Sequence, residues 1–148
     1  MKKIDIENKF NITETIRAIR KAHEELERSL DAERSVCTPI LTDVSLISDI
    51  LIVFRNQIGN RRMTMNDKRL FVFTIQYLYA PRNLFGRKMP KGLRRAIASA
   101  LGMNAESVVS DIGNKTLLHY QVYAKFRTDA NLVFEGIGEW LKENGFVK

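Results

Sequence analysis

Residues 90–112 read PKGLRRAIASALGMNAESVVSDI, and this stretch decides the expected fold. Leu93, Ile97 and Leu101 fall on one face of a helix, and Gly102 suits the left-handed residue that ends a helix. A second helix is expected to follow, with Asn104 as its cap. Its inward side chains would be Val108, Val109 and Ile112. Two short helices joined by a glycine turn form a helix-turn-helix, so the sequence predicts this motif at about residues 91–116.

The hairpin resembles the helix-turn-helix of LacI-type repressors and LuxR-type regulators. In those families an apolar residue and an alanine are followed by two variable positions, an apolar residue, a glycine, an apolar residue and a Ser-like cap. A further apolar residue comes four positions after the cap. The corresponding residues here are Ile97, Ala98, Leu101, Gly102, Met103, Asn104 and Val108, so the resemblance spans about 20 residues. The surrounding region, 68–134, also looks like small helix-turn-helix proteins of bacteriophages and mobile elements.

The resemblance implies that the second helix enters the major groove of DNA. Its candidate base-contacting residues are Ser107, Ser110 and Asn114, with Lys115 beyond them. Phosphate contacts would come from the basic residues ahead of it, which position the module without reading sequence. These residues are Arg82, Arg87, Lys88, Lys91, Arg94 and Arg95.

The second helix also departs from the expected pattern. It contains Glu106 and Asp111, whose charge has the wrong sign for phosphates, and Gly113 is expected to end it early. Two interpretations follow. Either the basic first helix and the preceding loop contact the nucleic acid, or the hairpin is an interaction motif that binds no DNA.

Basic residues are concentrated in the middle third of the chain. Residues 55–104 contain eleven Lys and Arg against one acid, Asp67, whereas the flanking thirds are slightly acidic. The eleven are Arg55, Arg61, Arg62, Lys68, Arg69, Arg82, Arg87, Lys88, Lys91, Arg94 and Arg95. Such a block favours a polyanion partner, most commonly nucleic acid; the alternative is a solvated face that serves solubility.

The overall composition is that of a folded, all-α protein. Hydrophobic residues make up 45% and charged residues 28% of the 148 residues, a profile typical of globular domains. Only three prolines interrupt the chain, and no run alternates in the way a β-strand requires. The sequence therefore predicts a single compact domain of about six helices at 37–148, preceded by an amphipathic helix at 1–36.

That first helix is expected to begin at a capping box, Asn11 to Glu14. Its apolar or semi-apolar positions alternate in steps of four and three, like a heptad repeat. They are Ile12, Ile16, Ile19, His23, Leu26 and Leu30. Residues 12–30 could therefore pair protomers or dock on a partner; alternatively, the helix packs on its own domain.

Four further helices are expected. One runs from about Thr42 to Ile58, capped by Thr42 or Asp43. It is apolar on more than one face, so we expect a core element that is buried on several sides. A second covers 66–79 and ends before Pro81. A third covers 116–126, and a last one begins at a Thr128 or Asp129 cap. The glycines at 136 and 138 would be explained by the close approach of another backbone.

No catalytic signature is present. The sequence has no phosphate-binding loop, no Cys-x-x-Cys pair and no His-Glu-x-x-His, so we expect neither an enzyme nor a cofactor nor a metal site. The lone Cys37 is interpreted as a small apolar residue in a reducing compartment. No apolar run approaches the length of a membrane span, and the first ten residues lack the apolar core of a signal peptide.

Two functions are therefore expected. The first is a DNA-binding accessory or regulatory protein of phage or mobile-element type, acting on double-stranded DNA in the cytoplasm. The alternative is a non-enzymatic helical assembly or adaptor protein, for example a virion component. Its basic middle third would then bind a protein partner or packaged nucleic acid.

Overall fold

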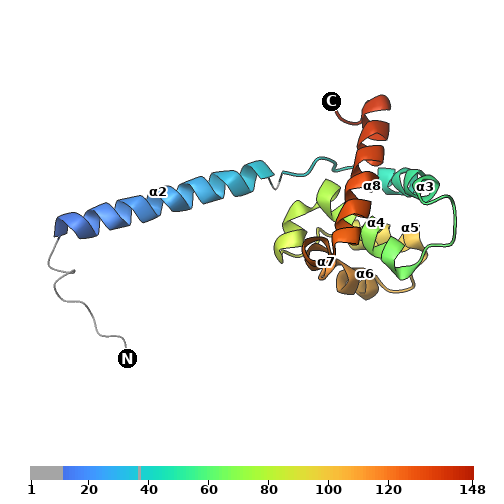
Figure 1. The fold of residues 1–148 in the computed structure, drawn as a ribbon, viewed down its shortest axis with the longest axis horizontal. Coiled ribbons are helices and arrows are strands. Elements are labelled where there is room, and N and C mark those ends of the chain that lie inside the picture. The colour runs from blue at the N-terminus through green and yellow to red at the C-terminus, as the bar shows by residue number, and fades with distance from the viewer. Residues whose placement is uncertain (1–11, 37) are drawn as a thin grey trace. The chain divides into compact units, whose positions relative to one another are not determined.

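The structure is a computed structural model that describes residues 12–36 and 38–148 (Figure 1). None of these described residues belongs to a β-strand, so the protein is all-α, as the sequence predicts. The chain divides between residues 37 and 38 into two units, which are described separately. The expected cap Asn11 and the single cysteine, Cys37, lie outside the described residues.

The first unit contributes one long amphipathic helix, α2 (Ile12–Val36). The second unit contains six α-helices and two short 3₁₀ helices. In chain order they are η1 (Val44–Leu46), α3 (Ile47–Gln57), α4 (Met65–Tyr79), η2 (Pro81–Phe85), α5 (Leu93–Leu101), α6 (Glu106–Gly113), α7 (Thr116–Val122) and α8 (Ala124–Glu143).

Helix α4 is the centre of the second unit. Every side chain from Leu70 to Gln76 is buried, and α4 packs against α3, α5, α6, α7, α8 and η2. Helix α3, which the sequence predicts as a core element buried on several sides, does contribute Ile47, Ile50, Leu51 and Phe54 to the core. It is buried on one side only, however, and leaves Ile52 58% exposed on the other. The phenylalanine-rich run at 70–75 fills all sides of α4 instead.

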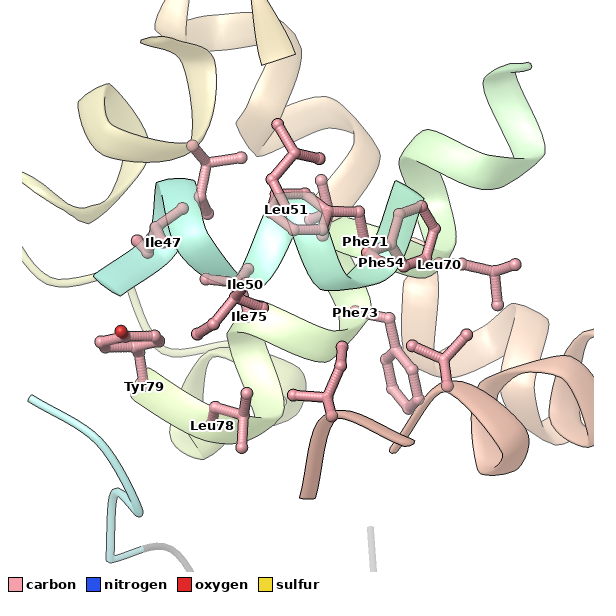
Figure 2. Close-up of a cluster of buried hydrophobic side chains, with 14 of the residues drawn as sticks. Ile47, Ile50, Leu51, Phe54, Leu70, Phe71, Phe73, Ile75, Leu78 and Tyr79 are labelled. Carbon is pink, nitrogen blue, oxygen red and sulfur yellow. The ribbon is translucent and has the colours of Figure 1, made fainter. Parts of the chain in front are cut away.

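Buried side chains of α3 and α4 pack together in the hydrophobic core (Figure 2). Phe54 and Phe71 meet with ring centroids 5.5 Å apart, a separation at which tilted rings attract each other. At the far end of α4, the Tyr79 hydroxyl donates to the Asp43 carbonyl at 2.7 Å, and burial raises the pKa of Tyr79 to about 12. These contacts fix the segment before α3 on α4.

A capping box starts α4. The Thr64 hydroxyl accepts from the Asp67 backbone N–H at 3.2 Å, and the Asp67 carboxylate accepts from the Thr64 N–H at 2.8 Å. Arg61 donates to both oxygens of the same carboxylate. Burial raises the pKa of Asp67, but the hydrogen bonds from Arg61 and Thr64 together outweigh it and lower that pKa below its ordinary value.

Three expected helix boundaries are wrong. Asp43, one of the two expected caps, does cap this segment, but the segment opens with η1, so α3 begins at Ile47 and not near Thr42. Helix α6 is capped at the extended residue Ala105, with no side-chain cap from Asn104. The chain also breaks at Tyr123, whose extended backbone separates α7 from α8, so Thr128 and Asp129 lie inside a helix. The Thr128 hydroxyl bonds to the Ala124 carbonyl, four residues earlier.

The two glycines of α8 do not meet another backbone. A Cβ atom on Gly136 would lie 1.8 Å from the Gln57 side-chain nitrogen, and one on Gly138 would meet no atom within 4 Å. The close neighbour at Gly136 is therefore a side chain, and Gly138 has no packing reason to be glycine. In the part of the chain that the structure describes, no helix is both long and apolar enough to cross a bilayer.

Candidate nucleic-acid interface

The two helices predicted at 91–116 are present as α5 and α6, joined by residues 102–105. Gly102 takes a left-handed conformation at φ 67°, which a residue with a side chain adopts at a cost. The Gly102 N–H donates to the Ser99 carbonyl at 3.2 Å, and the Met103 N–H donates to the Ala98 carbonyl at 2.8 Å. This pair of bonds is a Schellman motif, which ends α5 and turns the chain into α6.

A cavity of about 290 Å³ lies between this hairpin and the loop that precedes it. Its walls come from η2, from the loop that follows η2, and from both helices of the hairpin. The lining residues are Asn83, Gly86, Arg87, Lys88, Met89, Arg94, Ser110 and Asn114, and we call this site the basic cleft.

The basic cleft carries charge of one sign. Among the described residues that line it, three are cations and none is a carboxylate. Arg87, Lys88 and Arg94 are all exposed to solvent, so their charges are available to a ligand. A concave surface lined by cations concentrates the positive potential and attracts anions such as phosphate.

Two hydrogen bonds order the walls of the cleft. The Arg94 guanidinium donates to the Ser110 hydroxyl at 3.0 Å, which links α5 to α6. On the opposite wall the Asn83 side-chain amide donates to the Arg87 carbonyl at 2.7 Å. These bonds orient the Arg94 guanidinium and the loop backbone at Arg87.

A buried amide anchors the cleft to the core. Gln76 of α4 is fully buried, and its side-chain nitrogen donates to the Asn83 side-chain oxygen at 2.5 Å and to the Gly113 carbonyl at 3.0 Å. Its side-chain oxygen accepts from the Thr116 hydroxyl at 2.5 Å. One side chain therefore ties together η2, the end of α6 and the start of α7, so the two walls are fixed to the same point of α4.

The acidic start of α6 has a local partner. Arg95 lies 3.2 Å from the Glu106 carboxylate; the arginine is largely exposed and Glu106 is half-buried. Glu106 thus faces a cation of α5 and does not line the basic cleft, and neither does Asp111. The two carboxylates of α6, whose negative charge would repel phosphate, therefore lie outside the cleft.

The basic cleft brings together five of the ten predicted site residues: Arg87, Lys88, Arg94, Ser110 and Asn114. The other five are exposed but do not line it. Arg82 lies in η2, Lys91 in the loop before α5, and Arg95 beside Glu106. Ser107 lies in the first turn of α6 and Lys115 just before α7.

Sequence reasoning found the uncharged residues Ser110 and Asn114 but missed the rest of the uncharged lining. Asn83 and Met89 line the cleft, and Gln76 supports it from beneath. The one signal for Gln76 was a polar residue inside an otherwise apolar helix. A buried polar group must find partners, so such a residue indicates a hydrogen-bonded network at that point.

A larger cavity of about 730 Å³ lies where the end of α3 and the start of α4 meet α8. Its lining combines the cations Arg61 and Lys125 with the acids Asp67 and Asp129 and several aliphatic side chains. Arg61 and Asp67 form an ion pair with each other there, so their charges compensate. This cavity therefore has no preference for an anion, in contrast to the basic cleft.

No cluster of three or more His, Cys, Asp or Glu side chains suited to a metal ion occurs within residues 12–36 and 38–148, as far as they are described. Comparison of the chain with family models, with curated proteins and with solved structures finds no significant match. The interpretation of the basic cleft therefore depends on its own geometry and charge.

Proposed function

We propose that this protein is a DNA-binding accessory or regulatory protein that holds duplex DNA at the basic cleft. The observation that supports the proposal most directly is the cleft's lining of three cations without a carboxylate. Cationic side chains supply most of the affinity of proteins for DNA, because each phosphate they neutralise releases condensed counterions.

In this proposal the wall residues have different tasks. Arg87, Lys88 and Arg94 contact the phosphate backbone, and the Ser110 bond fixes the direction of the Arg94 guanidinium. Asn114 and the exposed Ser107 of α6 face the groove, where amide and hydroxyl groups bond to base edges. Phosphate contacts then position the module, and few contacts read sequence.

The decisive experiment is the salt dependence of binding to a labelled random-sequence duplex. The variant Arg87→Gln/Lys88→Gln/Arg94→Gln removes three positive charges from the cleft. Its matched control, Lys125→Gln/Arg127→Gln/Lys142→Gln, removes three exposed charges from α8. We expect the cleft variant to flatten the slope of log affinity against log salt by about 3, and the control to leave the slope nearly unchanged.

Two neighbouring arginines sharpen the test. Arg94→Gln and Arg95→Gln change composition identically, but only Arg94 lines the cleft, whereas Arg95 lies beside Glu106. Arg94→Gln should weaken binding more than Arg95→Gln does. Equal losses from both, or no binding by the unmodified protein at roughly 50 mM salt, would overturn the proposal.

A second candidate function is a helical assembly or adaptor protein. It is favoured by the exposed apolar side chains of α2 and by Asp111, an exposed carboxylate on the helix that would face DNA. In that case the basic cleft binds an acidic surface of a partner protein. This alternative would be supported if the protein showed no affinity for duplex DNA but bound to an immobilised acidic protein.

A further inference from the structure

Helix α2 presents a continuous apolar stripe to solvent. The stripe consists of Ile12, Ile16, Ile19, His23, Leu26 and Leu30, and its five aliphatic members are between 41% and 69% exposed. Their spacing of alternately four and three residues keeps them on one side of the helix for about five turns. Contiguous exposed apolar surface of this kind marks an interaction site on a soluble protein.

We propose that α2 pairs with α2 of a second copy of the chain in an antiparallel, two-fold symmetric dimer. Within the described residues of the first unit, α2 is one helix and has no second element of that unit to cover its apolar stripe. A second copy supplies an identical stripe, and a two-fold axis lets each protomer bury the same part of it, from Ile19 to Leu30. The dimer is independent of the proposed DNA binding, because no residue of the basic cleft lies in α2.

The charges beside the stripe select the antiparallel orientation. Arg20 and Glu27 follow Ile19 and Leu26 on one flank. In an antiparallel pair in which Ile19 faces Leu30 of the second copy, Arg20 lies beside Glu27 of the second copy. Symmetry repeats this ion pair, so the dimer gains two complementary contacts.

A parallel pair loses both contacts. Arg20 would then lie beside Thr15 of the second copy, and Glu27 beside Ala22, neither of which carries a charge. The polar His23 would also face itself, whereas in the antiparallel pair it faces Leu26. His23 Nε2 already lies 3.3 Å from the Glu27 carboxylate within one helix, so its polar edge has a partner at the border of the stripe.

The other flank allows close approach. It consists of the small residues Ala22 and Ser29, which lie beside each other in the antiparallel register. Small side chains there let the two helices come near enough for the stripe residues to interdigitate. The charged flank and the small flank thus indicate the same register, centred between Glu24 and Glu25.

Sedimentation equilibrium of the full chain tests the dimer. We expect a monomer–dimer equilibrium that Ile19→Ser/Leu26→Ser shifts to monomer. The matched control, Ala18→Ser/Ala32→Ser, places the same residue type on exposed positions away from the stripe and should stay dimeric. A wild-type monomer at every concentration, or a stripe variant that remains dimeric, overturns the proposal.

Charge reversal and cross-linking test the orientation. Arg20→Glu and Glu27→Arg should each weaken dimerisation by roughly tenfold, and the double exchange should restore it. In a Cys37→Ser background, mixed Ile19→Cys and Leu30→Cys chains should form a disulfide between the two different variants. Disulfides only between identical variants would show a parallel pair and overturn the antiparallel assignment.

Discussion

At the residue scale, neighbouring side chains of the same type have different surroundings. Arg94 and Arg95 are adjacent in sequence, and both were predicted to contact phosphate. The helical rotation of about 100° per residue sends Arg94 to the cleft and to Ser110, and Arg95 to Glu106. Sequence gives the charge of a residue, but the packing of α5 on α6 decides what that charge meets.

The ion pair at the start of α4 predicts a dependence of stability on pH. The pKa of Asp67 is lower in the folded protein than its ordinary value, so the unfolded chain binds this proton more readily. The stabilisation is therefore present above the unfolded pKa of about 3.9 and is lost as pH falls through the folded pKa. Asp67→Asn should lower the free energy of unfolding at pH 7 by about 1–3 kcal/mol.

Urea unfolding at pH 7 and pH 3 checks this prediction. The difference between Asp67→Asn and the unmodified protein should narrow at pH 3, because below the unfolded pKa the unfolded chain binds a proton at Asp67 more readily than the folded protein does. The control Asp111→Asn changes an exposed residue of α6 and should alter stability at pH 7 much less. A constant difference at both pH values would show that the carboxylate charge contributes nothing.

At the element scale, the short helix α6 depends on its anchor. It has only eight residues, too few to be stable by itself, and its end is fixed by the Gln76 bond to the Gly113 carbonyl. Sequence reasoning interpreted Gly113 as the residue that ends the helix, and α6 does end there. The structure adds that a Cβ atom on Gly113 would lie 2.9 Å from the Gln76 nitrogen.

Two glycine substitutions should therefore have opposite effects. Gly113→Ala crowds a buried amide that three partners hold in place, and it should destabilise the protein by about 1–3 kcal/mol. Gly138→Ala adds a methyl group that meets no atom within 4 Å inside α8, and should stabilise it by about 0.5–1 kcal/mol. Thermal unfolding of both variants measures the effects. Stabilisation by Gly113→Ala would show that the Gln76 network tolerates the methyl group.

At the scale of the whole molecule, the hydrophobic core formed by the described residues lies in the second unit. All the buried hydrophobic residues of the cluster lie between Leu41 and Leu141. The segment before α3 is attached to the same unit, because the Ile40 and Leu41 N–H groups both donate to the Leu78 carbonyl. Residues 38–148 therefore contain the contacts required for cooperative folding.

A fragment of residues 38–148 should accordingly fold without α2. We expect it to retain one cooperative urea transition with the midpoint of the full chain. Circular dichroism and sedimentation of the fragment provide the measurement. The fragment should also be monomeric if α2 forms the dimer. A lower midpoint would show that α2 contributes to the folding of the second unit.

The sequence by itself determined the helical class, the position of the α5–α6 hairpin and the concentration of basic residues in the middle third. These features are local, because helical periodicity, the left-handed glycine at 102 and net charge are properties of neighbouring residues. The all-round burial of α4 was not predictable in the same way. An apolar helix near the centre and one near the surface have similar patterns until their neighbours are known.

Only the tertiary structure decided which residues meet. Gln76 and Gly113 are 37 residues apart, and Arg94 and Ser110 are 16 apart, yet both pairs form hydrogen bonds that build the cleft. The break at Tyr123 likewise depends on packing, because it lets α7 and α8 both contact α4, where Tyr120 and Phe126 meet Phe73. Contacts between distant residues depend on how all the helices pack together, and the local sequence pattern contains no record of that packing.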